Sequence, residues 1–167
     1  RVLFDTGYPD GDWPRCVGSA VYRSLLPPRV RPGEGIAAQL IADGIDPRSV
    51  SHVVLSHLHP DHIGGLRDFP HATVVLTRGQ LDTVRRPRVR DALLTGLLPT
   101  PFPPQRSIVL ERSDFQPCTI ADSAPAASVY DLFGDGSYLV VDLPGHADGH
   151  VGALIHRAVL LAADAAW

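Results

Sequence analysis

The 167-residue sequence contains no methionine and no lysine, and it has only two cysteines. Its 15 basic residues are all arginine, and the formal net charge is −3. A protein that binds nucleic acid through the phosphate backbone needs a positively charged surface. The sequence therefore argues against nucleic acid as the main partner, and we expect a small-molecule substrate.

Long apolar runs are also missing. No stretch approaches the roughly 20 apolar residues of a membrane-spanning helix, so we expect no membrane-embedded domain. Cys16 and Cys118 form no C-x-x-C pair, which favours reduced thiols in a cytoplasmic protein over a thiolate metal site. Because the sequence starts at Arg1, inside an expected strand and without a leader, we expect a fragment of a longer protein.

Alternating strand and helix patterns predict one mixed α/β domain over residues 1–167. The predicted strands are short β-branched or alternating runs between turn residues, at 1–4, 51–56, 72–76, 129–133, 138–141, 151–155 and 158–162. Helical spacing predicts a helix over 34–42 and a mostly helical, basic segment over 77–98 that is broken at Pro87. The proline-rich residues 97–104 exclude regular structure. With the basic segment they form either a lid over a site or a solvated connector.

Three of the eight histidines fall within HLHPDHIGG, residues 57–65. Residues i and i+2 of an extended segment point the same way, so His57 and His59 are placed to chelate one ion. Pro60 keeps His59 extended and discourages an immediate helix, so Asp61 and His62 leave at a new angle and can serve a second ion. Imidazole and carboxylate ligands without cysteine favour a catalytic site that holds zinc, with iron and manganese also suitable.

This H-x-H-x-D-H pattern followed by Gly-Gly resembles the signature of the metallo-β-lactamase superfamily of hydrolases. Two further stretches agree with the resemblance, PGHADGH at 144–150 and LAAD at 161–164. The resemblance implies three histidines around one metal ion, an aspartate and a histidine around a second, and an aspartate that bridges both. In this sequence these ligands are His57, His59 and His146, then Asp61 and His62, and finally Asp164.

The resemblance also implies a four-layer αββα sandwich. This chain would be incomplete at both ends, because the opening strands of the family and its last histidine ligand have no counterpart here. The implied activity is hydrolysis of an ester, lactone or thioester carbonyl by a metal-bridging hydroxide, with Asp61 as the proton shuttle. Acyl-homoserine-lactone lactonases are the closest branch; a glyoxalase-II-like thioesterase and a metal-binding module without turnover are the alternatives.

Three positions distinguish this chain from particular branches of the superfamily. Classical β-lactamases carry cysteine in place of Asp164 and lack a histidine that matches His62, which disfavours antibiotic hydrolysis. Lactonases use a tyrosine three residues after the bridging aspartate to hold the substrate carbonyl. Trp167 stands there in this chain. Its indole N–H can donate one hydrogen bond to a substrate but cannot act as an acid, and plain packing is the alternative.

The remaining candidates have supporting roles. Asp5, at the end of the first predicted strand, either fixes the tautomer of a metal-bound imidazole or caps a turn. His150 is expected to support the site without binding metal. His52, His71 and His156 are expected at the surface.

Overall fold

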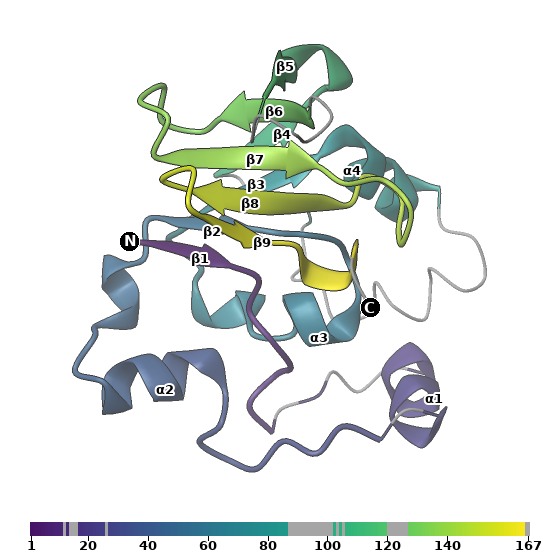
Figure 1. Ribbon diagram of the computed structural model, residues 1–167. Helices are drawn as coiled ribbons and strands as arrows, with labels where there is room; N and C mark the ends of the chain where they lie inside the picture. The colour runs from purple at the N-terminus through teal and green to yellow at the C-terminus, as the bar shows by residue number, and fades with distance from the viewer. Residues whose placement is uncertain are drawn as a thin grey trace.

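Two β-sheets form the framework of the computed structural model, which describes residues 1–11, 13, 17–25, 27–86, 102, 104, 106–119 and 127–165 (Figure 1). The first sheet is parallel, with the strand order β1-β2-β3-β4. Its strands are β1 (Val2–Phe4), β2 (His52–Val54), β3 (Thr73–Thr77) and β4 (Ser107–Leu110). Parallel strands need crossover connections, and those described here carry the helices α1 (Val17–Leu25), α2 (Ile36–Ala42), α3 (Pro60–Ile63) and α4 (Arg78–Arg85).

The second sheet is antiparallel and follows chain order, β5-β6-β7-β8-β9. Its strands are β5 (Gln116–Cys118), β6 (Ala127–Asp131), β7 (Tyr138–Asp142), β8 (Val151–Ile155) and β9 (Val159–Leu161). In the turn between β8 and β9, His156 and Arg157 have φ values of 47° and 54°. Positive φ at both central residues is the geometry of a type I′ turn, and the Ala158 N–H closes this turn by donating to the Ile155 carbonyl (2.9 Å).

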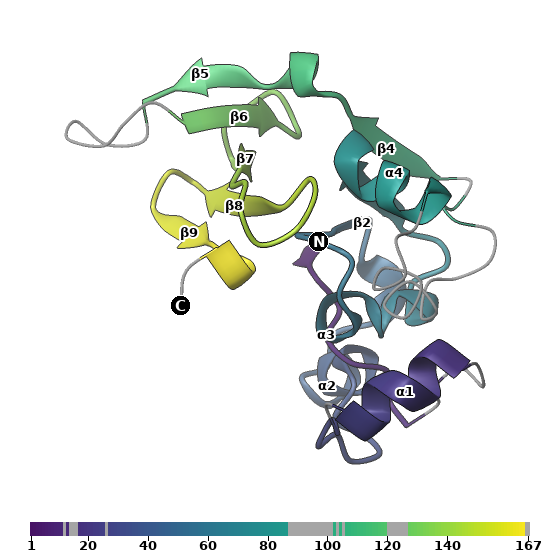
Figure 2. The ribbon, with the colours of Figure 1, turned by 90° about the vertical axis from the view of Figure 1, so that its right-hand side faces the viewer.

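The layers run from helices to the first sheet to the second sheet, as Figure 2 shows. One core cluster fills the space between the helices and the first sheet, where Val53 and Leu76 meet Leu81 of α4 and Leu40 of α2. Another lies between the two sheets. Its residues alternate along the strands and include Val54, Val75, Leu110, Tyr138, Val140, Val151 and Ala153.

These are three of the four layers of the predicted αββα sandwich. No helix covers the outer face of the second sheet in the part of the chain that the structure describes. That face carries its own apolar cluster, which includes Val129, Leu139, Val141 and Leu154. None of the described helices has the length and apolar character needed to cross a membrane.

The predicted strands are confirmed, with shifted ends. The strand expected over 129–133 ends at Asp131, because the Asp131 carboxylate accepts hydrogen bonds from the backbone N–H groups of Phe133 (3.3 Å), Gly134 (2.9 Å) and Gly136 (2.8 Å) and wraps the chain into a turn. The first part of the predicted helical segment 77–98 is α4, which begins with a capping box formed by Thr77 and Gln80. Residues 87–101 and most of the proline-rich segment lie outside the described residues, as does the proposed lid.

Candidate metal centre

The site is built at the carboxyl ends of the parallel strands, where β1, β2 and β3 run into Asp5, the Ser56–His57 pair and Thr77. Open parallel sheets place ligand sites at this edge. The apolar residues Val53 to Leu55 are fully buried, and the burial continues through Ser56 and His57, both 0% exposed. His57 therefore lies in the interior, three residues beyond the end of β2.

The next three ligand-type residues change direction at a proline. His59 is extended (φ −80°, ψ 153°), as predicted, and precedes the first residue of α3. The expectation that Pro60 would delay a helix is wrong, since α3 begins at Pro60 itself. Proline suits the first helical position because its missing N–H would have no partner there and its φ is already helical. The single turn carries Asp61 and His62, which belong to a different group of candidate ligands from His59.

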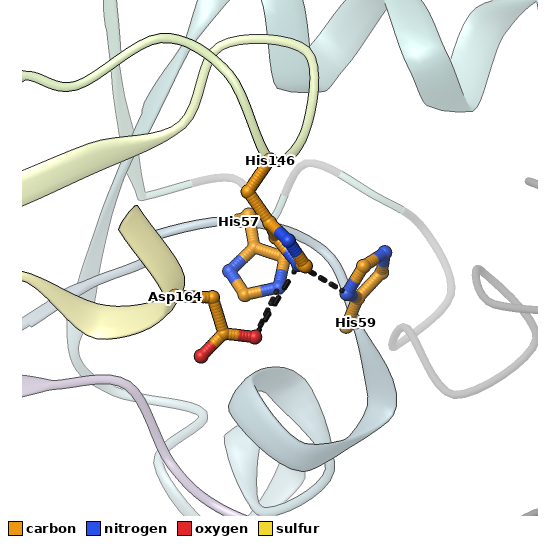
Figure 3. Close-up of side chains that lie close together, drawn as sticks. All are labelled: His57, His59, His146 and Asp164. Carbon is orange, nitrogen blue, oxygen red and sulfur yellow. Dashed lines mark hydrogen bonds and ion pairs between the residues drawn. The ribbon is translucent and has the colours of Figure 1, made fainter. Parts of the chain in front are cut away.

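Three histidines and an aspartate from distant parts of the chain converge in the first group (Figure 3). His59 Nδ1 lies 3.1 Å from His146 Nε2. Asp164 Oδ2 lies 3.3 Å from His146 Nε2 and 3.8 Å from His57 Nε2. Ligand atoms about 2.0–2.1 Å from a tetrahedral ion stand roughly 3.3–3.4 Å apart, and the measured distances bracket this value. The four side chains thus have the spacing of ligands that share one ion.

The second group contains Asp61, His62 and the same Asp164. His62 Nε2 lies 3.5 Å from Asp61 Oδ2 and 3.6 Å from Asp164 Oδ1. Asp164 therefore turns Oδ2 toward the first group and Oδ1 toward the second. It sits in a short 3-10 turn after β9, where Ala163 adopts a left-handed φ of 46° that is unusual for alanine.

The hydrogen bonds behind the cluster decide which imidazole nitrogen carries a proton. The Ser56 hydroxyl donates to Asp5 Oδ2 (2.7 Å), because a carboxylate only accepts, so it is left to accept from His57 Nδ1 (3.0 Å). His62 Nδ1 donates to Asp5 Oδ2 (2.8 Å). In each ring the N–H points backward and Nε2 faces the cluster. Asp5 thus fixes a tautomer, the first of the two roles predicted for it.

Further contacts lock Asp5 and the α3 turn together. The Ser56 backbone N–H donates to Asp5 Oδ1 (2.7 Å), and the Thr6 N–H donates to the His62 carbonyl (2.7 Å). Asp5 has a φ of 63°, a left-handed conformation that aspartate tolerates better than most residues. This bend directs its carboxylate under both His57 and His62.

Burial and charge shift the two histidines that share Ser56 and Asp5 in opposite directions. Burial, followed by the charges of His62 and the other nearby histidines, lowers the pKa of His57 to about 2. Burial also acts to lower the pKa of His62, but its hydrogen bonds to Asp5 and Asp61 and the charges of these carboxylates raise it to about 10. His57 is therefore a neutral ligand at any physiological pH.

A cation fits the groups that face this centre. His57 Nε2 is buried and has no hydrogen-bond partner among the described residues. A buried nitrogen lone pair without a partner is costly unless something accepts it, and a metal ion does. Neutral imidazoles and carboxylates are also the ligands that zinc, iron and manganese take.

The supporting histidines differ from one another. His150 is 0% exposed, donates from Nδ1 to the Leu143 carbonyl (2.9 Å) and belongs to neither candidate metal group, which agrees with its predicted supporting role. His156 is exposed as predicted, whereas His52 and His71 are half-buried, His52 because its ring packs edge-on against Phe133. Trp167 lies outside the described residues, and its predicted roles stay predictions.

Comparison with known proteins agrees with this geometry. A sequence model described as the metallo-beta-lactamase superfamily matches residues 1–163. The chain belongs to the metallo-β-lactamase superfamily. Within the superfamily it is similar to the N-acyl homoserine lactonase AttM of Azorhizobium caulinodans (35% identical, 84% of this chain and 50% of that protein) and to the probable metallo-hydrolase Rv2300c of Mycobacterium tuberculosis (32%, 98% and 52%). The chain thus spans about half the length of these relatives.

Solved structures place it in the same fold. An N-acyl homoserine lactone hydrolase with the product N-hexanoyl-L-homoserine at its catalytic metal centre superposes with a TM-score of 0.63 at 20% identity, over 92% of this chain and 53% of that one. A probable metal-dependent hydrolase from Staphylococcus aureus gives a TM-score of 0.64 at 17% identity, over 92% and 49%. The metallo-β-lactamase fold follows from these matches and the family match together.

Proposed function

We propose that the centre holds two divalent ions, zinc in both positions, and opens the lactone ring of a small acylated substrate. The observation that carries the proposal is the division of the Asp164 carboxylate, with Oδ2 toward His57 and His146 and Oδ1 toward His62. One carboxylate between two ligand sets is the arrangement of a bridged metal pair. A single ion in the first group would not explain why Asp61 and His62 lie within ligand distance of Asp164.

His57, His59, His146 and Asp164 would hold the first ion, and Asp61, His62 and Asp164 the second. When bound, such a pair polarises a carbonyl and lowers the pKa of water toward neutrality. The protein contributes fixed ligand orientation, through Ser56 and Asp5, and a base. Burial raises the pKa of Asp61, but its hydrogen bond to His62 and the charge of that ring outweigh burial and hold the pKa below its ordinary value.

Asp61 is therefore ionised at neutral pH, and its side chain is 40% exposed. A half-exposed carboxylate beside the cluster can take the proton of the attacking water and pass it to the leaving alkoxide, which is the shuttle role predicted from the sequence. The lactone class is supported by the AttM lactonases among the similar proteins. The weak negative charge of the chain supports a small substrate over a nucleic acid.

The test is metal analysis of the full-length protein together with hydrolysis of three substrates: an acyl homoserine lactone, an acyl thioester and a phosphodiester. We expect two zinc equivalents and preferential lactone opening. Preferential thioester cleavage would move the assignment to the glyoxalase-II-like alternative. Two metal equivalents without hydrolysis of any substrate would identify a metal-binding module, and less than one equivalent would overturn the metal centre.

A further inference from the structure

Gln80, in the first turn of α4, is a buried amide that no metal-ligand motif contains. Its side chain is 1% exposed. The Nε2 group lies 3.0 Å from the Leu55 carbonyl, 2.9 Å from the Ser56 carbonyl and 3.1 Å from the Gly149 carbonyl. Oε1 accepts a hydrogen bond from the Thr77 N–H (3.2 Å). The two amide hydrogens are therefore shared among three acceptors, and the amide has no free orientation.

The three carbonyls belong to the two segments that supply the histidines of the first group. Leu55 and Ser56 run directly into His57, and Gly149 ends the loop that carries His146. Among the described residues, one backbone hydrogen bond joins these segments, from the Val151 N–H to the Ser56 carbonyl (3.0 Å), and the His57 ring also contacts the rings of His146 and His150. Gln80 joins them a second time, and the Thr77 hydroxyl, which donates to the Gly149 carbonyl (2.9 Å), holds the loop to the start of α4.

The start of α4 approaches the histidine loop too closely for side chains between them. A Cβ on Gly79 would lie 2.9 Å from the Gly149 Cα, and a Cβ on Gly149 would lie 2.2 Å from Thr77 Oγ1. Gly149 also has a φ of 71°, which favours glycine. The backbones lie against each other here, and the Gln80 side chain donates hydrogen bonds to both the strand end and the loop.

We propose that Gln80 is a positioning residue that sets the separation of His57 and His146, and with it the affinity of the first metal ion. The proposal rests on the metal centre proposed above. The second group depends on different contacts, because Asp61 and His62 lie on α3 and His62 is held by Asp5. Loss of the Gln80 amide should therefore weaken the first ion and leave the second nearly unchanged. Supporting contacts around metal ligands are commonly worth about 10- to 100-fold in affinity.

Gln80→Met tests this, since methionine has a similar length and no hydrogen-bond donor. The first readout needs no metal. Hydrogen exchange of the metal-free protein should speed up at the His150 and Val151 amides in the variant, because the loop loses its second tether. The second readout is a cobalt(II) titration followed by absorption, in which His62→Ala protein marks the bands of the first group alone. We expect about 10- to 100-fold weaker binding in those bands.

Two controls separate positioning from general destabilisation. Leu81→Ala opens the core next to Gln80 on the same helix but removes no hydrogen bond to either histidine segment, so it should lower stability without changing the ratio of the two affinities. Gln116→Met makes the same chemical change at an exposed residue of β5 and should change nothing. If Gln80→Met does not fold, Gln80→Asn, which keeps both amide hydrogens on a shorter side chain, takes its place in the same comparison.

The outcomes are distinct. An unchanged affinity ratio and unchanged exchange in a folded Gln80 variant would refute the positioning role while leaving the metal centre intact. Equal weakening of both ions in the Gln80 and Leu81 variants would also refute it, since stability alone would then explain the loss. Wild-type protein that binds no cobalt would overturn the proposed function instead, and the exchange result would still decide whether Gln80 tethers the loop.

Discussion

Replacing Asp5 by asparagine would disturb the second metal position without removing any ligand. The Asp5 carboxylate accepts three hydrogen bonds, from the Ser56 N–H, the Ser56 hydroxyl and His62 Nδ1, all within 2.7–2.8 Å. Asparagine offers one oxygen and one NH₂ group in the same space. If the NH₂ group takes the place of Oδ1, it faces the Ser56 N–H and two donors oppose each other. If it takes the place of Oδ2, it faces His62 Nδ1, and that nitrogen must then accept a hydrogen bond. A ring that accepts at Nδ1 carries its proton on Nε2, where the ion must bind.

The size of the effect follows from the bond that is lost. A hydrogen bond to a charged group contributes about 1.5–3 kcal/mol, and each 1.4 kcal/mol is about tenfold in an equilibrium constant. Asp5→Asn should therefore weaken the second ion by about 10- to 150-fold. The effect on the first ion should be smaller, because Asp5 reaches His57 only through the Ser56 hydroxyl.

Stepwise dissociation constants, measured on metal-free protein by competition with a chromophoric chelator, would show this difference. Asp43→Asn removes the same charge from the exposed end of α2 and serves as the control. Unchanged binding of the second ion in a folded Asp5→Asn protein would refute the tautomer argument. Equal loss of both ions, with a lower unfolding midpoint, would show that Asp5 acts through the fold instead.

Three further experiments test the metal ligands, the protonation of His57 and the close contact between α4 and the His146 loop. His57→Ala and His146→Ala should each abolish hydrolysis and lower metal content as measured by atomic emission, whereas exposed His156→Ala should alter neither; an active, metal-replete His57→Ala protein would contradict the ligand assignment. As pH falls from 6.5 to 4.5, urea titrations of the metal-free protein should show the unfolding free energy falling. His57 alone contributes up to about 1.4 kcal/mol per pH unit, because its pKa is about 2 in the fold against about 6.5 in the unfolded chain, so the unfolded state binds more protons. Constant stability over this range would argue against a buried neutral ring. Gly149→Ala should cost at least about 1–3 kcal/mol of stability, because its φ is 71° and the new Cβ would meet Thr77 Oγ1, and an unchanged thermal midpoint would disprove the close approach.

Sequence patterns predicted most of the strands because the burial of their side chains follows a regular pattern along the chain. β2 and β3 are buried and β-branched, and β7 and β8 alternate between the two apolar clusters that flank their sheet. Three elements, α1, β4 and β5, were not predicted. Among the predicted elements the errors fall at the ends, where side-chain contacts decide the geometry. The Asp131 turn and the start of α3 at Pro60 each depend on one hydrogen-bonding or steric detail that hydrophobic periodicity does not contain.

The ligand residues were predictable because each motif places chemically distinctive side chains at fixed spacing. The residues that orient them were harder to find. Ser56 gave no signal beyond its place before His57, although its hydroxyl links Asp5 to that ring. Gln80 carried a signal that was missed, the T-x-x-Q capping box at the start of α4, yet its contacts with Leu55 and Gly149 arise only from tertiary packing.

The opposite pKa shifts of His57 and His62 follow from one arrangement of hydrogen bonds. Ser56 and Asp5 stand behind both rings, but His57 meets a neutral hydroxyl in a buried pocket whereas His62 meets carboxylates at both of its nitrogens, Asp5 behind and Asp61 in front. The metal-free centre therefore keeps His57 ready as a neutral ligand and stores a proton on His62. That proton occupies Nε2, the atom that faces Asp61 and Asp164. A divalent ion must displace it, so the carboxylates that hold the proton in the metal-free protein are the ones that would hold the ion, and the group gains one positive charge in the exchange.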